Sequence, residues 1–113
     1  MSKRIAVVIS EDPRTTARPV EALRIALGLY AGDHKLTVIL LGQTPRLLKE
    51  DLEDITDAEI LEKNLPSFKH LSIPFVLEEG TVLDGGMKDF SVTTLPADEI
   101  RHFVRSVDRS LIF

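Results

Sequence analysis

Residues 4–10 form an apolar run, Arg-Ile-Ala-Val-Val-Ile-Ser, which stops at a polar turn over residues 11–14. Because successive strand residues point to opposite sides, a strand without polar positions is apolar on both faces, which is typical of a parallel sheet covered by helices on both sides. This run therefore predicts a first strand near the centre of a sheet. Further apolar runs predict strands at residues 36–41, 73–77 and 109–113.

The pattern after the first run predicts a helix that ends at Gly32. Thr15 or Thr16 can cap its N-terminus, and Pro19 is tolerated in the first turn because amide hydrogens there lack intrahelical partners. Apolar side chains recur at helical spacing along it, at Val20, Leu23, Leu27 and Tyr30. We therefore expect this helix to lie on the sheet.

Residues 46–71 have a less regular apolar pattern. A short helix followed by a loop is expected first, because an acidic run at residues 50–54 interrupts the apolar positions. Thr56 and Glu59 then have the spacing of a capping box, in which each side chain bonds a backbone amide near the other residue. This spacing predicts a second helix that starts at Asp57.

The second half of the chain contains an interrupted helix, a further strand and the clearest helix of the sequence. Pro66 is expected to break or kink the second helix near residues 64–65. Residues 81–86 predict a turn and loop, and the alternating pattern at residues 89–94 predicts a half-buried fourth strand. Residues 96–107 carry apolar side chains on one stripe and acidic residues in the first turn, which indicates a helix.

Length and composition restrict the fold class. The chain has 113 residues, 43% of them hydrophobic, a net charge of −4 and no cysteine. We expect a single α/β domain over residues 1–113, a three-layer sandwich with a mainly parallel sheet of about five strands and helices on both faces. The interspersed charges argue against nucleic acid as a partner. Without a membrane-spanning run or a signal-peptide core, a cytoplasmic protein is expected, with no membrane partner.

Open parallel sheets bind ligands outside the carboxyl ends of their strands, which here makes Ser10, Arg14, Gln43 and Glu78 the candidate ligand-binding residues. Arg14 precedes a helix N-terminus, where phosphate or sulfate is favoured, although ordinary capping explains this turn as well. The turn lacks the glycines of a phosphate loop or a dinucleotide-binding motif. Glu78 is either a general base or hydrogen-bonding anchor, or part of a solvated loop with Glu79.

No catalytic nucleophile, metal site or cofactor is recognisable. The histidines lie in a loop, at a helix end and on a helix surface, without second ligands at metal-binding spacing, at His34, His70 and His102. His102 follows Asp98 by one helical turn, which favours a helix-surface pair. Arg101 and Arg105 share a face of the same helix, which indicates solvent or the carboxylates of a partner.

The order of these elements resembles the DsrE/DsrF-like family, which includes sulfur-relay subunits. The residues that carry the resemblance are 3–9, the helix through 22–27, and the closing helix, Asp-Arg pair and strand at 96–113. The resemblance spans nearly the whole chain and implies a DsrEFH-like or flavodoxin-like fold. Members that carry sulfur are expected to hold a persulfide on a cysteine just after the third strand, where this chain has Leu-Glu-Glu-Gly at residues 77–80.

The resemblance therefore implies an oligomeric accessory or binding module without sulfur-carrier chemistry. We expect a homo-oligomer, a trimer or a hexamer, because so short a chain has few helices to cover a five-stranded sheet. DsrE-like proteins are further possible partners. The alternative is an enzyme, or a small-anion or nucleotide-binding protein, that uses the crevice at the carboxyl ends of the strands.

Overall fold

The computed structural model describes residues 2–49, 51–81 and 89–113. Over these ranges the elements are, in chain order, β1 (Arg4–Ile9), α1 (Arg18–Ala31), β2 (Lys35–Leu40), the 3₁₀ helix η1 (Thr44–Leu48), α2 (Ala58–His70), β3 (Phe75–Glu78), β4 (Val92–Leu95), α3 (Ala97–Ser106) and β5 (Arg109–Ile112). The loop expected over residues 81–86 lies, beyond Thr81, outside the described residues.

The strands form one parallel sheet of five strands in the order β4-β3-β2-β1-β5. β1 pairs with β2 on one side and with β5 on the other, so it is an interior strand, as its apolar run predicts. Ile5 to Ile9 are all buried. β4, whose two threonines are exposed, lies at one edge of the sheet, which agrees with the less covered position expected from its alternating pattern.

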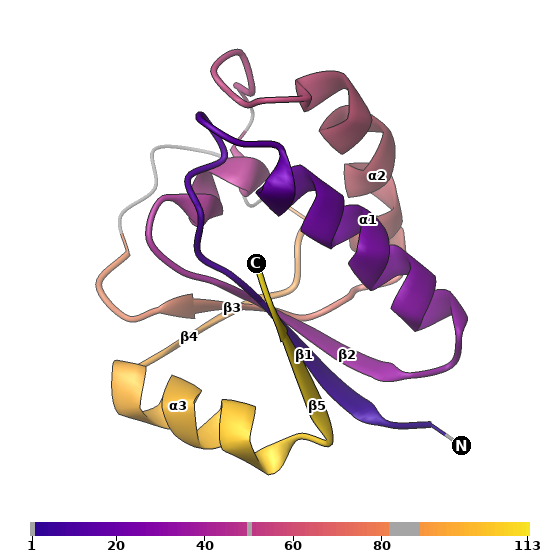
Figure 1. The fold of residues 1–113 in the computed structure, drawn as a ribbon, viewed down its shortest axis with the longest axis vertical. Helices are drawn as coiled ribbons and strands as arrows, with labels where there is room; N and C mark the ends of the chain where they lie inside the picture. The colour runs from indigo at the N-terminus through magenta and orange to yellow at the C-terminus, as the bar shows by residue number, and fades with distance from the viewer. Residues whose placement is uncertain (1, 50, 82–88) are drawn as a thin grey trace.

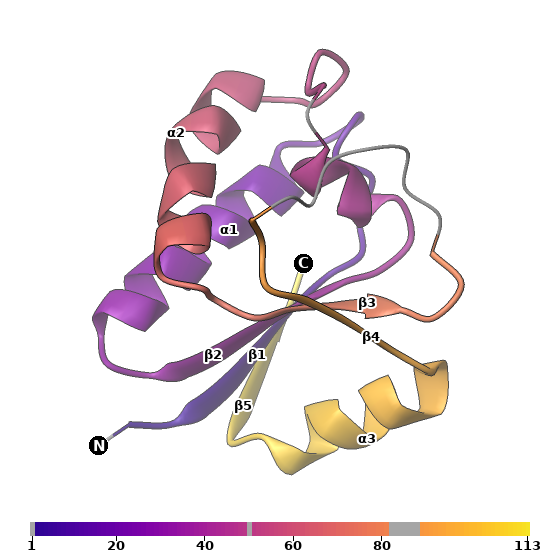
Figure 2. The same cartoon turned by 180° about the vertical axis from the view of Figure 1, so that it is seen from behind.

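Helices cover the sheet from both sides, which confirms the three-layer α/β class. Figures 1 and 2 show α1 and α2 on one side of the sheet and α3 on the other. The larger core lies on the α1 and α2 side, where Leu23, Leu61 and Phe68 pack against the strands. The smaller core, under α3, consists of Ala6, Val8, Ile39, Val76 and Ile100. One face is therefore much better covered than the other.

The local signals around α1 are confirmed in part. Pro19 and Gly32 lie where the sequence predicts, but the threonine cap is wrong, because the N-cap is Ala17, which makes no side-chain cap hydrogen bond. The amide N–H of Arg18 donates to the hydroxyl oxygen of Thr16 at 3.3 Å, and Pro19 lies in the first turn. Gly32 is the C-cap, and its N–H donates to carbonyl groups of the last turn. None of the helices in the described ranges is long and apolar enough to span a membrane.

The capping box predicted at Thr56 and Glu59 is wrong. Asp57, the N-cap of α2, has a left-handed conformation with φ of 61°, and its side chain makes no cap hydrogen bond. The Thr56 hydroxyl instead donates to the carbonyl oxygen of Arg14 at 3.1 Å, and the Thr56 N–H donates to that of Pro13 at 2.8 Å. The Thr56 side chain is therefore held against the loop after β1, and the N-cap position of α2 is occupied by Asp57.

α2 runs through Pro66 without interruption, so the break expected near residues 64–65 is absent. Proline lacks the N–H that would bond to the preceding turn, which normally destabilises a helix interior. Leu65 and Phe68 are buried on either side of the exposed Pro66. Their burial against the core holds the helix together across the missing hydrogen bond.

Candidate functional site

Ser10 lies directly after β1, at the carboxyl edge of the sheet. Its N–H donates to the carbonyl oxygen of Phe113 at 2.8 Å, and its hydroxyl donates to the same oxygen at 3.3 Å. The guanidinium of Arg18 lies 5.7 Å from the centre of the Phe113 ring and forms an ion pair with Glu11. The polar groups of Ser10 therefore join the end of β1 to the end of β5.

Arg14 is held by a carboxylate two residues earlier in the chain. Its Nε and Nη2 donate to the two carboxylate oxygens of Asp12 at 3.0 and 2.8 Å. These side-chain hydrogen bonds, with one from the backbone N–H of Arg14, lower the pKa of Asp12 to about 2. The same pairing raises the pKa of Arg14. The charge that we expected to attract an anion is thus balanced within the turn.

Gln43 is also paired locally, in the turn that leads from β2 into η1. Its side-chain oxygen accepts a hydrogen bond from Nε of Arg46 at 2.9 Å. Arg46 in addition forms an ion pair with Asp54, with 3.6 Å between Nη1 and Oδ2. The side chain of Gln43 therefore positions an arginine that reaches the loop before α2.

Glu78 ends β3 and is exposed. Phe75 and Leu77 belong to the core under α1 and α2, whereas Val76 belongs to the core under α3, so alternation directs Glu78 to the α3 side. η1, which follows Gln43, contributes to the opposite core. No hydrogen bond joins the four candidate residues within the described ranges, and their shared ligand site stays a prediction.

Thr44 is a structural residue at the carboxyl edge of the sheet that the sequence patterns did not identify. It is the buried polar residue of the described chain, with 0% of its surface exposed. Its hydroxyl lies 2.7 Å from the carbonyl oxygen of Leu41 and 3.1 Å from that of Ile9. The signal that could have found it is a hydroxyl residue directly after a strand and a Gly-Gln turn.

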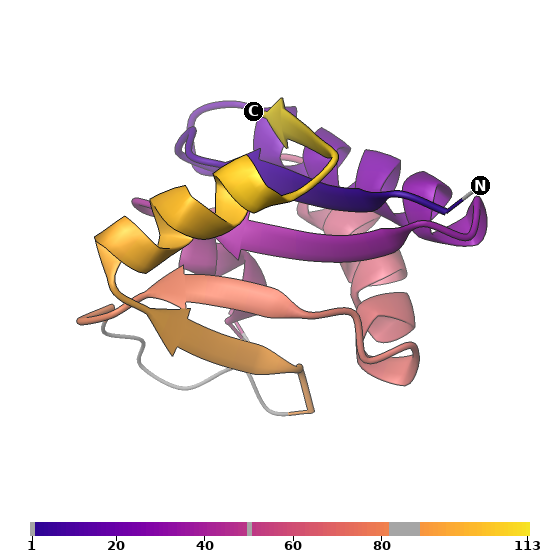
Figure 3. The same cartoon turned by 90° about the horizontal axis from the view of Figure 1, so that it is seen from below.

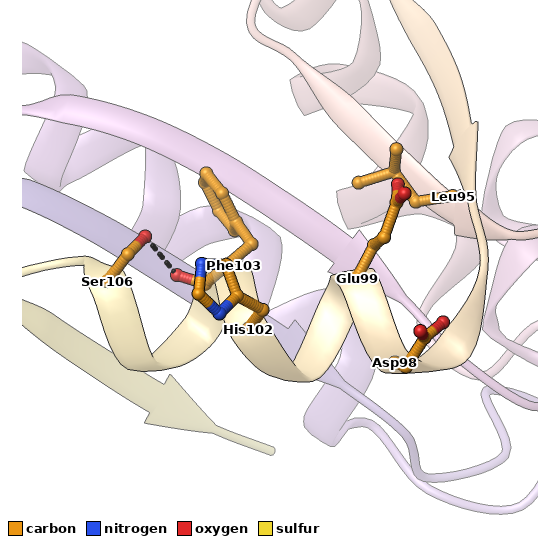
Figure 4. A pocket seen from close by; sticks show the side chains of 6 residues that line it. All are labelled: Leu95, Asp98, Glu99, His102, Phe103 and Ser106. Atoms are coloured by element: carbon orange, nitrogen blue, oxygen red, sulfur yellow. Dashed lines mark hydrogen bonds between the residues drawn. The ribbon is translucent and has the colours of Figure 1, made fainter.

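A groove of about 640 Å³ runs along one flank of α3. Its lining, drawn in Figure 4, consists of Leu95, Asp98, Glu99, His102, Phe103 and Ser106. A smaller hollow of about 260 Å³ shares Phe103 and extends toward the start of β2, at Lys35 and Thr37. Helix α3 crosses the sheet diagonally, as Figure 3 shows.

The groove combines apolar side chains with two carboxylates. The Ser106 hydroxyl donates to the carbonyl oxygen of Phe103 at 2.7 Å and is not bonded to His102 (Figure 4). The pair expected between Asp98 and His102 is absent from the interactions of the described residues. This arrangement is suited to binding by burial and charge.

No family model matches the sequence, and no curated protein matches it. Among solved structures, the chain is similar to the crystal structure of the ychN protein from E. coli, which has a DsrE/DsrF-like fold. The TM-score is 0.76, with 18% sequence identity over 100% of both chains. The fold is DsrE-like. At this identity the likeness concerns the fold alone. In this chain β3 ends at Glu78, and Glu79 follows it.

Proposed function

We propose that this chain is an oligomeric DsrE/DsrF-like accessory or binding module that does not carry sulfur. The observation that supports the proposal is the end of β3, where Glu78 and Glu79 stand at the place at which sulfur-carrying members are expected to hold their cysteine. The chain has no cysteine at any other position. A persulfide forms on a thiolate sulfur, and a carboxylate cannot replace it.

The polar groups at the carboxyl edge also favour binding over catalysis. Arg14 and Gln43 are both used in local side-chain pairs. Arg18 is paired with Glu11. Groups that are committed to holding turns in place are poorly suited to accept or deliver protons during a reaction.

Homo-oligomerisation is the second part of the proposal. Within the described residues, α3 alone covers one face of the five-stranded sheet (Figure 3). Ile112, on the edge strand β5, has 68% of its surface exposed. A large aliphatic side chain at an uncovered sheet edge is stabilised by a protein partner, and a copy of the same chain is the partner that is always present.

The absence of sulfur-carrier chemistry is tested by incubating the protein with a persulfide donor and measuring its intact mass. The wild-type chain should gain no sulfur. The variant Glu78→Cys, which places a thiol at the end of β3, is the matched control and should gain sulfur that a reductant removes. Reductant-sensitive sulfur on the wild-type chain would overturn the proposal.

The assembly is tested by light scattering coupled to size-exclusion chromatography over a wide range of protein concentration. We expect the mass of a trimer or a hexamer. A monomer mass at every concentration would remove the oligomeric part of the proposal and leave the sulfur chemistry untouched.

A further inference from the structure

We infer that the outer edge of β5 pairs with β5 of a second copy, in antiparallel orientation across a two-fold axis. This inference deepens the proposed homo-oligomerisation and rests on it. Figure 3 shows β5 at the border of the sheet, on the side opposite β4. The contact would join the two five-stranded sheets into one continuous sheet.

The outer side of β5 carries backbone hydrogen-bonding groups that pair with no strand of the described residues. The N–H of Phe113 donates to the carbonyl oxygen of Val8, and the carbonyl oxygen of Phe113 accepts from the N–H of Ser10, both at 2.8 Å. Residues of a strand bond to the left and right neighbour alternately, so the backbone groups of Ser110 and Ile112 point away from β1. An edge of this kind is a template for another strand.

The side chains of β5 do not protect this edge. Ile112 is 68% exposed, more than the other exposed large aliphatic residues of the described chain, Ile60 at 41% and Leu71 at 39%. Proteins commonly guard edge strands with proline, lysine or an inward-pointing charge. β5 has neither proline nor lysine, and its one charged residue, Arg109, stands at its start.

The sequence of β5 is complementary to itself under a two-fold axis through Leu111. Ser110 and Ile112 share the α3 face, since they are in register with Ala6 and Val8. In the antiparallel pair the small Ser110 of each copy lies opposite Ile112 of the other, and the two copies of Leu111 face each other across the axis. Such cross-strand pairs are the units that stabilise a sheet.

Charge favours the antiparallel pair over a parallel one. Parallel pairing in register would place Arg109 against its own copy, whereas the antiparallel pair places it opposite Phe113 of the partner. Like charges directly opposite each other destabilise a strand pair.

A two-fold contact is a feature of dimers and of hexamers with two-fold axes, and is not found in a closed trimer. Of the two expected assemblies, the β5 contact therefore favours the hexamer.

Two variants block the edge without touching the contact with β1. Ser110→Pro removes an outward-pointing N–H, and Ile112→Lys adds a charge at an exposed position. Each should halve the mass found by light scattering. The matched controls Ser110→Ala and Ile60→Lys should retain the wild-type mass, and circular dichroism verifies that every variant is folded.

A cross-link provides a second readout, which is clean because the chain has no cysteine of its own. Opposed residues in a non-hydrogen-bonded antiparallel pair lie close enough for a disulfide. Leu111→Cys should therefore form a covalent dimer on mild oxidation, and Ile60→Cys should not.

The outcomes separate this inference from the proposed assembly. A wild-type oligomer whose mass Ile112→Lys leaves unchanged, or a Leu111→Cys chain that cross-links no more than Ile60→Cys, overturns the β5 contact and leaves the oligomer standing. A wild-type monomer at every concentration overturns both.

Discussion

Arg14 donates three hydrogen bonds to the carboxylate of Asp12, two from its guanidinium at 3.0 and 2.8 Å and one from its backbone N–H at 2.9 Å. The pKa of Asp12 falls from 3.8 to about 2 for this reason. Because the folded pKa lies below the unfolded one, the charged carboxylate stabilises the fold. This stabilisation is fully present above pH 3.8 and is lost as the pH falls toward about 2.

The first prediction follows from this pair and is tested by an NMR titration of the Asp12 carboxyl carbon. In Arg14→Gln the pKa of Asp12 should rise toward its ordinary value of 3.8. Arg101→Gln, a substitution on α3 away from the turn, is the control and should leave the titration unchanged. An Asp12 in the wild-type protein that titrates at its ordinary pKa would contradict the ion pair.

The second prediction concerns the buried hydroxyl of Thr44. Thr44→Val keeps the shape of the side chain but removes the donor that serves the carbonyl groups of Ile9 and Leu41. We expect the free energy of unfolding to fall by about 1 kcal/mol, the usual net value of one hydrogen bond, as measured by urea denaturation. Thr15→Val, at an exposed position of the β1–α1 turn, should cost less, and equal losses would argue against a special role for Thr44.

The third prediction concerns the aromatic centre of the larger core. The ring of Phe75 lies 5.3 Å from that of Phe68 and 5.7 Å, edge to face, from that of Phe90. Phe75→Ala should reduce the free energy of unfolding by about 3–5 kcal/mol, because it leaves a cavity between these rings. Phe75→Leu, which keeps most of the volume, should cost roughly 1 kcal/mol. Similar denaturation midpoints for the two variants would contradict this packing.

The fourth prediction concerns Pro66, which lies inside α2 and is exposed. Pro66→Ala restores a backbone donor to the helix. Proline costs about 3 kcal/mol relative to alanine in a helix interior, and roughly 1 kcal/mol of this is offset because proline also restricts the unfolded chain. The variant should therefore be more stable by about 2 kcal/mol in thermal denaturation, whereas Lys63→Ala, exposed on the same helix, should change little. A destabilised Pro66→Ala would show that the proline ring itself packs favourably.

Most of the architecture was predictable because burial leaves a pattern along the chain. The unbroken apolar run at Ile5 to Ile9 requires cover on both faces, and β1 has it. The stripe at Ile100 and Phe103 predicted α3 for the same reason, and both side chains contribute to the smaller core. The candidate site was less predictable, since the partner of a polar side chain is chosen by geometry. Arg14 forms an ion pair with Asp12 in its own turn. The sequence pattern around such an arginine is the same whether the arginine pairs locally or binds an anion.

The sequence by itself determined the alternation of strands and helices, the interior position of β1, and the chemistry excluded by the lack of a thiol. These properties depend on which side chains are present and on their spacing. Only the tertiary structure decided that Thr56 bonds to the loop after β1 instead of capping α2, and that Ile112 is exposed. Both properties depend on which segments lie side by side in the fold. Ile112 is exposed because the order of strands places β5 at an edge of the sheet, with a neighbouring strand on one side only, and the apolar character of β5 does not determine that position.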